Sequence, residues 1–345
     1  MNQVSVKIPG KVMLAGEYSV LFGGSALAAT VKNQMDITAE SHDAGRCHLD
    51  SELLKDATEF STSDEPNGPF ALFFTSALSG MRRHNISGAK VSVKGDLQPE
   101  FGFGSSSALR FGTAVALKTL ASGTKEDTYW EEAQEAYKLQ KKSQSQASGY
   151  DIVTQYMGGV TLLTPEKSDT QHSPTWPGRV TVFPASAVER LNQIVHVFVG
   201  GKGAPTTSTI KSTLTWLREE DLLTALGEAS EALIAAFRAA LEDSAETPNL
   251  TPLLNAVCKH RAIFAHAPTF PHALLTALAA VEDFGKDFSF KTTGAGGEDS
   301  VLLVGYQEQI TEATQVLAKL GWAKIESPFS ERGLGVECTQ SAGGI

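Results

Sequence analysis

The chain has 345 residues, of which 41% are hydrophobic, so it is long enough for two domains and can bury a large core. Its formal net charge of −10 argues against nucleic acid or an anionic membrane surface as a general partner, because both attract a basic surface. The chain does not start with a charged and then apolar leader, and no apolar run reaches the length of a membrane span, so we expect a cytoplasmic protein.

Patterns in the first half of the chain predict short strands and amphipathic helices. Residues 4–8 alternate apolar and polar side chains, and Pro9-Gly10 predicts a tight turn into a second strand over residues 11–18. Further strands are predicted at residues 26–31, 35–39, 89–93 and 158–163. Helices are predicted at residues 70–81, 105–120 and 130–142.

The polar residues 165–177 predict a connection between two domains, residues 1–170 and 171–345. Beyond this connection, strands are predicted at residues 180–183, 194–199, 288–291 and 301–304. Helices are predicted at residues 209–218, 222–241, 253–265, 272–284 and 307–320, and a loose tail at residues 339–345. The order of these elements predicts an α+β fold rather than repeating βαβ units.

The cysteines and histidines predict no metal centre. Cys47, Cys258 and Cys338 are far apart, and we expect reduced, structural thiols. His260 and His266 are six residues apart and do not share a helical face as an i,i+4 pair does, which favours surface or packing roles.

A glycine-serine loop at residues 99–108 leads directly into the helix that is predicted from residue 105. Gly102 and Gly104 let the backbone approach a ligand closely. The first amides of the helix would face an anion that the helix dipole favours, and they belong to Ser105, Ser106, Ser107 and Ala108. The serine hydroxyls add donors or a contact to Mg²⁺. Because the loop has neither the Gly-Lys-Ser/Thr of a Walker loop nor the third glycine of a dinucleotide fingerprint, it predicts another kind of phosphate site or a plain connection.

Two other segments join this loop in a specific order. Residues 9–18 (Pro-Gly-Lys-Val-Met-Leu-Ala-Gly-Glu-Tyr), the loop, and residues 291–299 (Lys-Thr-Thr-Gly-Ala-Gly-Gly-Glu-Asp) resemble the three motifs of the GHMP kinase superfamily. This superfamily includes galactokinase, homoserine kinase, mevalonate kinase and phosphomevalonate kinase. The resemblance spans nearly the whole chain and implies a two-domain GHMP kinase fold, with a ribosomal protein S5 domain 2-like N-terminal domain and a ferredoxin-like C-terminal domain. It also implies ATP and Mg²⁺ as cofactors.

Finer features resemble the phosphomevalonate kinase family. Residues 148–151 (Ser-Gly-Tyr-Asp) are similar to that family's Ser-Gly-aromatic-Asp segment, and residues 200–208 are similar to its glycine-rich turn. Asp299 after the third motif's glycines is also similar, whereas Ile152 stands where mevalonate kinases usually have asparagine.

The resemblance leaves the Mg²⁺ site incomplete. Mevalonate kinase and galactokinase carry a Mg²⁺-binding glutamate shortly before the catalytic aspartate, but here residues 139–142 in that neighbourhood are Leu-Gln-Lys-Lys. We therefore assign Mg²⁺ to Ser106 and leave its carboxylate ligand open.

The resemblance also implies roles for the motif residues. Lys11 would lie near the acceptor and the γ-phosphate, and Asp151 would approach the same acceptor, so these two are the predicted catalytic residues. The predicted substrate-binding residues are Glu17, Tyr18, Ser148, Gly149, Lys202, Gly294, Ala295 and Gly296. Lys202 is the first candidate for a second substrate phosphate, with Lys7 and Arg110 behind it.

We therefore predict an ATP-dependent kinase that phosphorylates phosphomevalonate in the mevalonate pathway of isoprenoid biosynthesis. The alternatives are mevalonate kinase, a sugar or sugar-phosphate kinase of the same fold, and a non-catalytic nucleotide-binding regulator. An alcohol acceptor needs Asp151 as a base, whereas a phosphate acceptor is already ionised and needs only orientation. The expected ligands are ATP and a small phosphorylated acceptor, bound by a monomer or homodimer.

Overall fold

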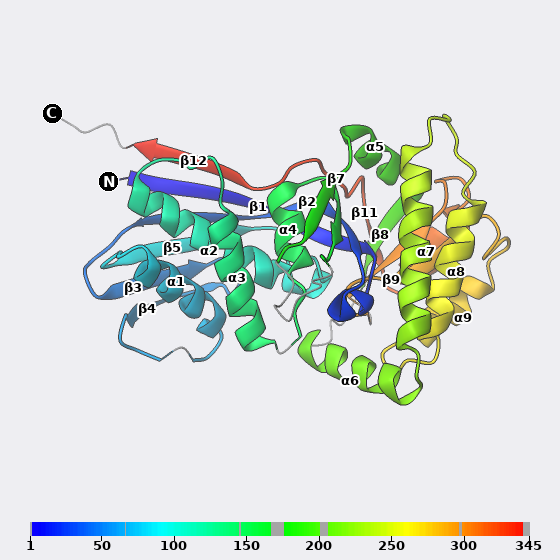
Figure 1. Cartoon of the computed structure of the whole chain (residues 1–345), viewed down its shortest axis with the longest axis horizontal. Coiled ribbons are helices and arrows are strands. Elements are labelled where there is room, and N and C mark those ends of the chain that lie inside the picture. Colours follow the sequence, from blue (N-terminus) through cyan, green and yellow to red (C-terminus); the bar gives the residue numbers. More distant parts are fainter. Residues whose placement is uncertain are drawn as a thin grey trace.

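The computed structural model describes residues 2–65, 67–144, 146–166, 176–200, 206–296 and 299–340. Within these ranges the strands form one sheet of eight strands and one of four. The two sheets lie at opposite ends of an elongated molecule, and helices cover each of them (Figure 1). In the described part of the chain, no helix combines the length and the apolar character that crossing a membrane requires.

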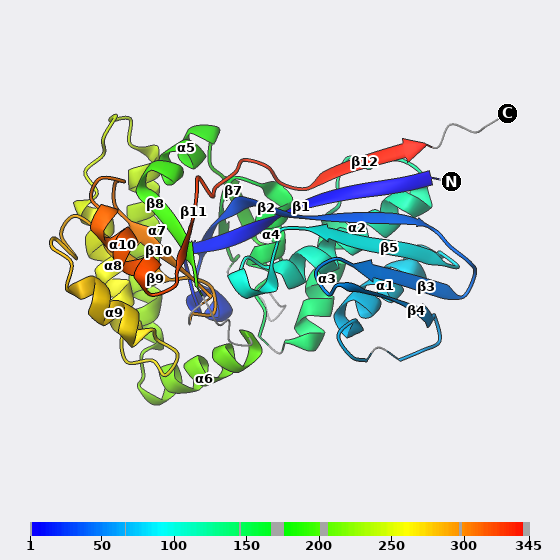
Figure 2. The ribbon, with the colours of Figure 1, turned by 180° about the vertical axis from the view of Figure 1, so that it is seen from behind.

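The larger sheet contains both ends of the described chain. Its strands are β1 (Asn2–Ala15), β2 (Ala26–Ser41), β3 (Arg46–Ser51), β4 (Asp56–Ser61), β5 (Ala89–Gly95), β6 (Val160–Thr164), β7 (Arg179–Val182) and β12 (Gly335–Gln340). They follow the order β12-β1-β2-β5-β3-β4, and β6 pairs with both β2 and β7. Only the pairing of β3 with β5 is parallel among these strands. Strand β12 runs beside β1, so the two ends of the chain meet at one edge (Figures 1 and 2).

The turn predicted at Pro9-Gly10 is wrong, because β1 continues through both residues. Pro9 pairs with Gln34, and the register shifts between Pro9 and Lys11, so a β-bulge accommodates the proline. A Cβ on Gly10 would lie 2.5 Å from the Leu97 side chain and 2.9 Å from that of Val31, so a larger residue here would force both side chains to move. The irregularity leaves the Lys11 amide free to donate to the Phe103 carbonyl in the glycine-serine loop, at 2.9 Å.

The predicted strands at residues 26–31 and 35–39 are likewise parts of one strand, β2. Its first part pairs with β6 and its last part with β5, so β2 pairs with two different strands along the same edge. Strands β3, β4 and β12 were not predicted.

Four helices pack beside the larger sheet: α1 (Ala71–Arg83), α2 (Ser105–Ser122), α3 (Trp130–Ser143) and α4 (Tyr150–Met157). Short 3-10 turns are η1 (Ser19–Phe22), which follows the first motif, and η2 (Pro99–Phe101), which opens the glycine-serine loop. The first three helices confirm the predicted positions, and α4 was not predicted. In Figure 2 the sheet lies in front of α1, α2 and α3, so these helices share one of its faces.

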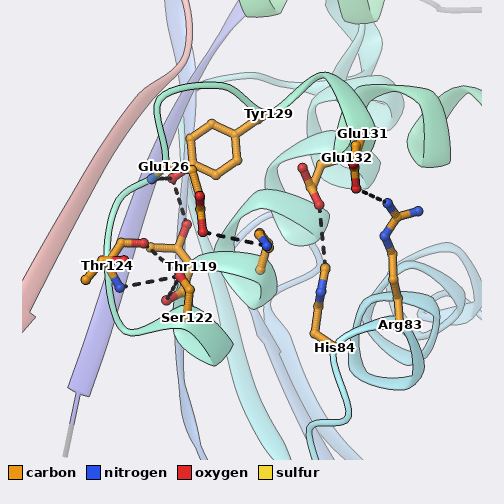
Figure 3. A network of polar contacts seen from close by, with 10 residues as sticks. Arg83, His84, Thr119, Ser122, Thr124, Glu126, Tyr129, Glu131 and Glu132 are labelled. Atoms are coloured by element: carbon orange, nitrogen blue, oxygen red, sulfur yellow. Dashed lines mark hydrogen bonds and ion pairs between the residues drawn. The ribbon is translucent and has the colours of Figure 1, made fainter.

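A polar network holds α1 and α2 to the start of α3 (Figure 3). Arg83 lies 2.9 Å from Glu131, and the ring of His84 lies 3.7 Å from the buried carboxylate of Glu132. The Thr119 hydroxyl is hydrogen-bonded to that of Tyr129 at 3.0 Å. These contacts fix α3, the helix that carries one wall of the site described below.

The smaller sheet has the order β11-β8-β10-β9 with antiparallel pairs. Its strands are β8 (Val195–Val199), β9 (Ser289–Thr292), β10 (Ser300–Val304) and β11 (Ala323–Ile325). Counted along the chain this order is 4-1-3-2, the ferredoxin-like arrangement that was predicted. Its helices are α5 (Ala185–Ile194), α6 (Thr206–Glu219), α7 (Leu223–Glu242), α8 (Thr251–Phe264), α9 (His272–Ala279) and α10 (Thr311–Lys319).

The division between the sheets does not coincide with the boundary predicted after residue 170. Strands β7 and β12 both follow that residue, yet both lie in the larger sheet. The reason is long-range pairing: β7 hydrogen-bonds to β6 and β12 to β1. The chain therefore leaves the first sheet, builds the second, and returns to the first.

Candidate active site

A cavity of about 300 Å³ lies where the three motifs meet. Its wall combines the middle of β1, the start of α2, the start of α4 and the turn after β9. Ten predicted site residues line it: Lys11, Tyr18, Gly102, Gly104, Ser105, Ser106, Ser148, Asp151, Gly294 and Ala295. Segments that are far apart in the sequence thus share one cavity.

The glycine-serine loop has the backbone geometry that a close approach requires. Gly104 adopts a φ of 79°, and a Cβ there would lie 2.9 Å from the Lys11 side chain and 3.1 Å from the Ser107 hydroxyl. Helix α2 begins at Ser105, so its first amides precede the helical hydrogen bonds, and Ser105 and Ser106 line the cavity.

Two of the predicted phosphate ligands do not reach the cavity. Ser107 is fully buried and donates its hydroxyl hydrogen bond to the Gly104 carbonyl, at 2.8 Å. The Ala108 amide donates to the same carbonyl at 3.0 Å. Neither residue lines the cavity, since the first turn of α2 uses the Ser107 hydroxyl and the Ala108 amide, and their role as phosphate ligands stays a prediction.

Lys11 is buried, and its ammonium group is held over the cavity. Its Nζ donates to the Gly102 carbonyl at 3.1 Å and lies 5.4 Å from the centre of the Tyr150 ring. Burial lowers the pKa of Lys11, while the carboxylates of Asp151, Asp299 and Glu17 oppose that shift. A lysine in this position can meet an incoming anion with few water molecules to displace.

Asp151 lies in the first turn of α4 and is also buried. One carboxylate oxygen accepts from the Gln140 side-chain amide at 2.9 Å, and the other accepts from the Ile152 backbone amide at 3.0 Å. Both oxygens are therefore fixed while the carboxylate faces the cavity that Lys11 lines.

The third motif is tied to the first by direct hydrogen bonds. The Thr293 hydroxyl accepts from the Met13 amide at 3.1 Å and donates to the Met13 carbonyl at 2.7 Å. The Tyr18 hydroxyl donates to the Ala295 carbonyl, and burial raises the pKa of Tyr18 to about 12. Gly296 lies outside the main cavity and lines a smaller one beside it.

Glu17 does not line the main cavity either. It is 3% exposed, accepts a hydrogen bond from Lys291 and lies 3.7 Å from the ring nitrogen of His260. Burial lowers the pKa of Lys291, which Glu17 opposes, and burial with the nearby Lys291 lowers that of His260 to about 3. In the structure Glu17 therefore joins the first motif to β9 and α8 instead of reaching into the cavity.

The segment before α4 is held from behind by aromatic side chains. The Trp176 indole donates to the Ser148 carbonyl at 3.0 Å, and the Trp176 ring stacks on Tyr137 with centres 4.6 Å apart. A Cβ on Gly149 would come within 2.7 Å of both rings. Gly149 therefore packs beneath the loop, and Lys202 lies outside the described residues.

Several cavity residues were not predicted. Asp299 lines it beside the loop, since a Cβ on Gly102 would lie 3.2 Å from the Cβ of Asp299. Gln140 and Tyr150 also line it. Asp299 is the last residue of the third motif and Tyr150 belongs to the Ser-Gly-Tyr-Asp segment, which was the available signal, whereas Gln140 is brought in only by the packing of α3 beside α4.

Comparison with known proteins supports the resemblance. Residues 72–159 match the model of the GHMP kinases N terminal domain. A mevalonate kinase from Thermococcus onnurineus is 25% identical over 185 residues, which is 50% of this chain and 54% of that protein. Two further mevalonate kinases match over similar lengths, so the chain spans about half the length of the curated relatives it matches.

The fold agrees with solved structures over nearly the whole chain. A Lactococcus lactis galactokinase complexed with galactose gives a TM-score of 0.72 at 14% identity, covering 96% of this chain and 95% of that one. Streptococcus pneumoniae phosphomevalonate kinase in complex with phosphomevalonate and AMPPNP gives 0.70 at 16% identity, with coverage of 97% and 99%. These likenesses confirm the predicted α+β fold, which kinases of different acceptors share.

Proposed function

We propose that the chain is an ATP-dependent kinase that phosphorylates a hydroxyl group of a small acceptor, and that this acceptor is mevalonate. The observation that carries the proposal is the shared cavity of Lys11, Asp151 and the start of α2. Phosphoryl transfer asks a protein mainly to position two reactants and to neutralise charge on the transferred group.

Each part of the cavity has a task in this reaction. The amides of Ser105 and Ser106 bind ATP phosphates at the helix N-terminus, and Lys11 neutralises charge on the γ-phosphoryl group. Asp151 accepts the acceptor's hydroxyl proton as the hydroxyl oxygen bonds to the γ-phosphorus and the bond from that phosphorus to the bridging oxygen breaks. ADP and the phosphorylated acceptor leave, and Asp151 returns its proton to solvent.

The oxygen donors on the cavity wall fit Mg²⁺. Ser106 offers a hydroxyl and Asp299 a carboxylate against the same loop, and Mg²⁺ prefers such ligands. Across the described residues, no three His, Cys, Asp or Glu side chains cluster as a dedicated metal site, which suits a cation shared with nucleotide phosphates. When bound, Mg²⁺ supplies charge neutralisation on the β- and γ-phosphates.

Two observations favour mevalonate over the predicted phosphomevalonate. Among the described residues that line the cavity, Lys11 is the cationic side chain, and an acceptor phosphate would need further cations. Arg110 and Lys7 do not line it: Arg110 is bonded to the Ser106 carbonyl and the Ser143 hydroxyl, and Lys7 pairs with Glu337. The curated relatives cited above are also mevalonate kinases.

The test is ADP release with ATP and Mg²⁺ against mevalonate, phosphomevalonate, galactose and a heptose phosphate. Mevalonate should dominate, and Lys11→Met and Asp151→Asn should each lower kcat by about 100-fold or more. Lys7→Met is the matched control, because Lys7 is an exposed lysine on the same strand.

Turnover with phosphomevalonate alone would refute mevalonate as the acceptor, and Lys202 would then be the next residue to test. Nucleotide binding without ADP release from any acceptor would refute the kinase and favour a regulator.

A further inference from the structure

Gln140 is the residue on the cavity wall whose position is best defined and whose role is unassigned. It lies near the end of α3, is 6% exposed and donates from Nε2 to one carboxylate oxygen of Asp151 at 2.9 Å. A carboxylate can only accept in this pair, so the amide nitrogen must face Asp151 and the amide oxygen must face away. That oxygen is buried and has no hydrogen-bond partner among the described residues.

A chain of hydrogen bonds fixes Gln140 from behind. The Ser143 hydroxyl donates to the Gln140 carbonyl at 3.0 Å and accepts from the Arg110 guanidinium at 2.8 Å. The same guanidinium donates to the Ser106 carbonyl at 3.3 Å. Arg110 is 4% exposed whereas Ser143 is exposed, so this chain runs from the start of α2 past the surface at the end of α3 to the start of α4.

The charge of the side chain at this position matters. A second carboxylate in place of Gln140 would lie directly against Asp151 and repel it, whereas the neutral amide gives Asp151 a donor. Burial lowers the pKa of Lys11 and of Arg110, and the Asp151 charge opposes that lowering in both.

We propose that Gln140 is a positioning residue, which orients the Asp151 carboxylate toward the acceptor and keeps it in register with the phosphate-binding start of α2. This inference rests on the proposed kinase function. It assigns to an uncharged amide a position that the sequence resemblance associates with a metal-binding glutamate.

The first test is a double-mutant cycle of Gln140→Leu and Asp151→Ala, in which each substitution removes the hydrogen bond. In the parent background Gln140→Leu should lower kcat about 10- to 100-fold, the range for a hydrogen bond to a charged group, with ATP affinity unchanged. In the Asp151→Ala background the same substitution should change kcat less than about twofold. Gln134→Leu, an exposed glutamine of the same helix, is the matched control.

A second variant separates positioning from packing. In Gln140→Glu, the protonated acid at low pH can donate to Asp151 as the amide does, whereas the ionised acid at high pH repels it. The activity of this variant relative to the parent should therefore fall as pH rises. The proposal would be overturned if the activity of Gln140→Glu relative to the parent did not change with pH. Equal losses of kcat from Gln140→Leu in the parent and Asp151→Ala backgrounds would also overturn it.

The same cycle is read by thermal unfolding, which needs no substrate. Coupling between the two substitutions in unfolding supports the hydrogen bond, and strict additivity overturns the proposal even if the parent phosphorylates none of the acceptors. Failure of the kinase function and failure of this inference are thus distinguishable.

Discussion

Replacing Glu17 by glutamine tests whether the first motif is held by a buried ion pair. Glu17 and Lys291 are 4% and 1% exposed at their side chains, and His260 lies against the same carboxylate. Removing one charge of such a pair leaves the other in the interior without compensation. Breaking a buried pair in this way costs about 3–5 kcal/mol.

That cost converts to a measurable shift of the melting temperature. Unfolding entropy of about 2.1 cal/mol/K per residue gives about 0.7 kcal/mol/K for a chain of this length, so the expected loss is about 4–7 °C. The loss of melting temperature in Glu17→Gln should also depend on pH. Without Glu17, Lys291 loses its proton in the folded state but keeps it when unfolded, so the stability of the variant rises as pH rises from 7 toward 10.

Differential scanning calorimetry at pH 7 and pH 9 measures both effects. Glu337→Gln is the matched control, since Glu337 pairs with Lys7 at 3.5 Å but is 68% exposed and should change the melting temperature by no more than about 1 °C. A Glu17→Gln melting temperature as high as that of the control would refute the argument. So would a deficit that is larger at pH 9 than at pH 7.

Three further predictions concern the cavity and the buried histidine. Gly104→Ala should lower kcat/KM at least about 10-fold by displacing Lys11, whereas Gly45→Ala, which has the same left-handed φ but open space around it, should cost only about 1 kcal/mol of stability without a kinetic effect. Because the pKa of His260 is lowered to about 3, the unfolded chain binds a proton that the folded chain does not, and the free energy of unfolding should fall by about 1.4 kcal/mol per pH unit from pH 6 toward 3. Urea titrations at several pH values should show that the free energy of unfolding of His260→Gln falls less steeply over this range. Asp299→Asn should weaken Mn²⁺ binding to the nucleotide complex about 10-fold, measured by electron paramagnetic resonance, and unchanged affinity would exclude it as the metal's carboxylate.

The sequence predicts local backbone structure where that structure depends on residues that are neighbours in the chain. The glycine-serine loop and the start of α2 are set by Gly102, Gly104 and the serines that follow, and the structure has them as predicted. Pro9-Gly10 has an equally strong local signature for a turn, but pairing with Gln34 keeps it in a strand. A local rule cannot include a partner strand that lies further along the chain.

Strand β12 and the Gln140–Asp151 contact also depend on partners that are distant in the sequence or in another helix. Strand β12 pairs with β1 across almost the entire sequence, so the strand was not predicted and its last two residues were assigned to the tail. The Gln140–Asp151 contact is also tertiary, since it requires α3 to pack beside α4. The sequence resemblance shows only that a carboxylate is absent there, and the structure shows that the Gln140 amide contacts Asp151 instead.

Strand β1 explains why three motifs from distant parts of the chain share one cavity. At its bulge the Lys11 amide bonds to Phe103 of the second motif. Two residues on, Met13 exchanges two hydrogen bonds with Thr293 of the third motif, and beyond the strand Glu17 pairs with Lys291. Because one strand bonds to the other two motifs, a shift of the smaller sheet relative to the larger one must strain these contacts. The spacing between the glycine-serine loop and the third motif is therefore set by β1, so a substitution such as Glu17→Gln, outside the cavity wall, is expected to change the geometry of the cavity.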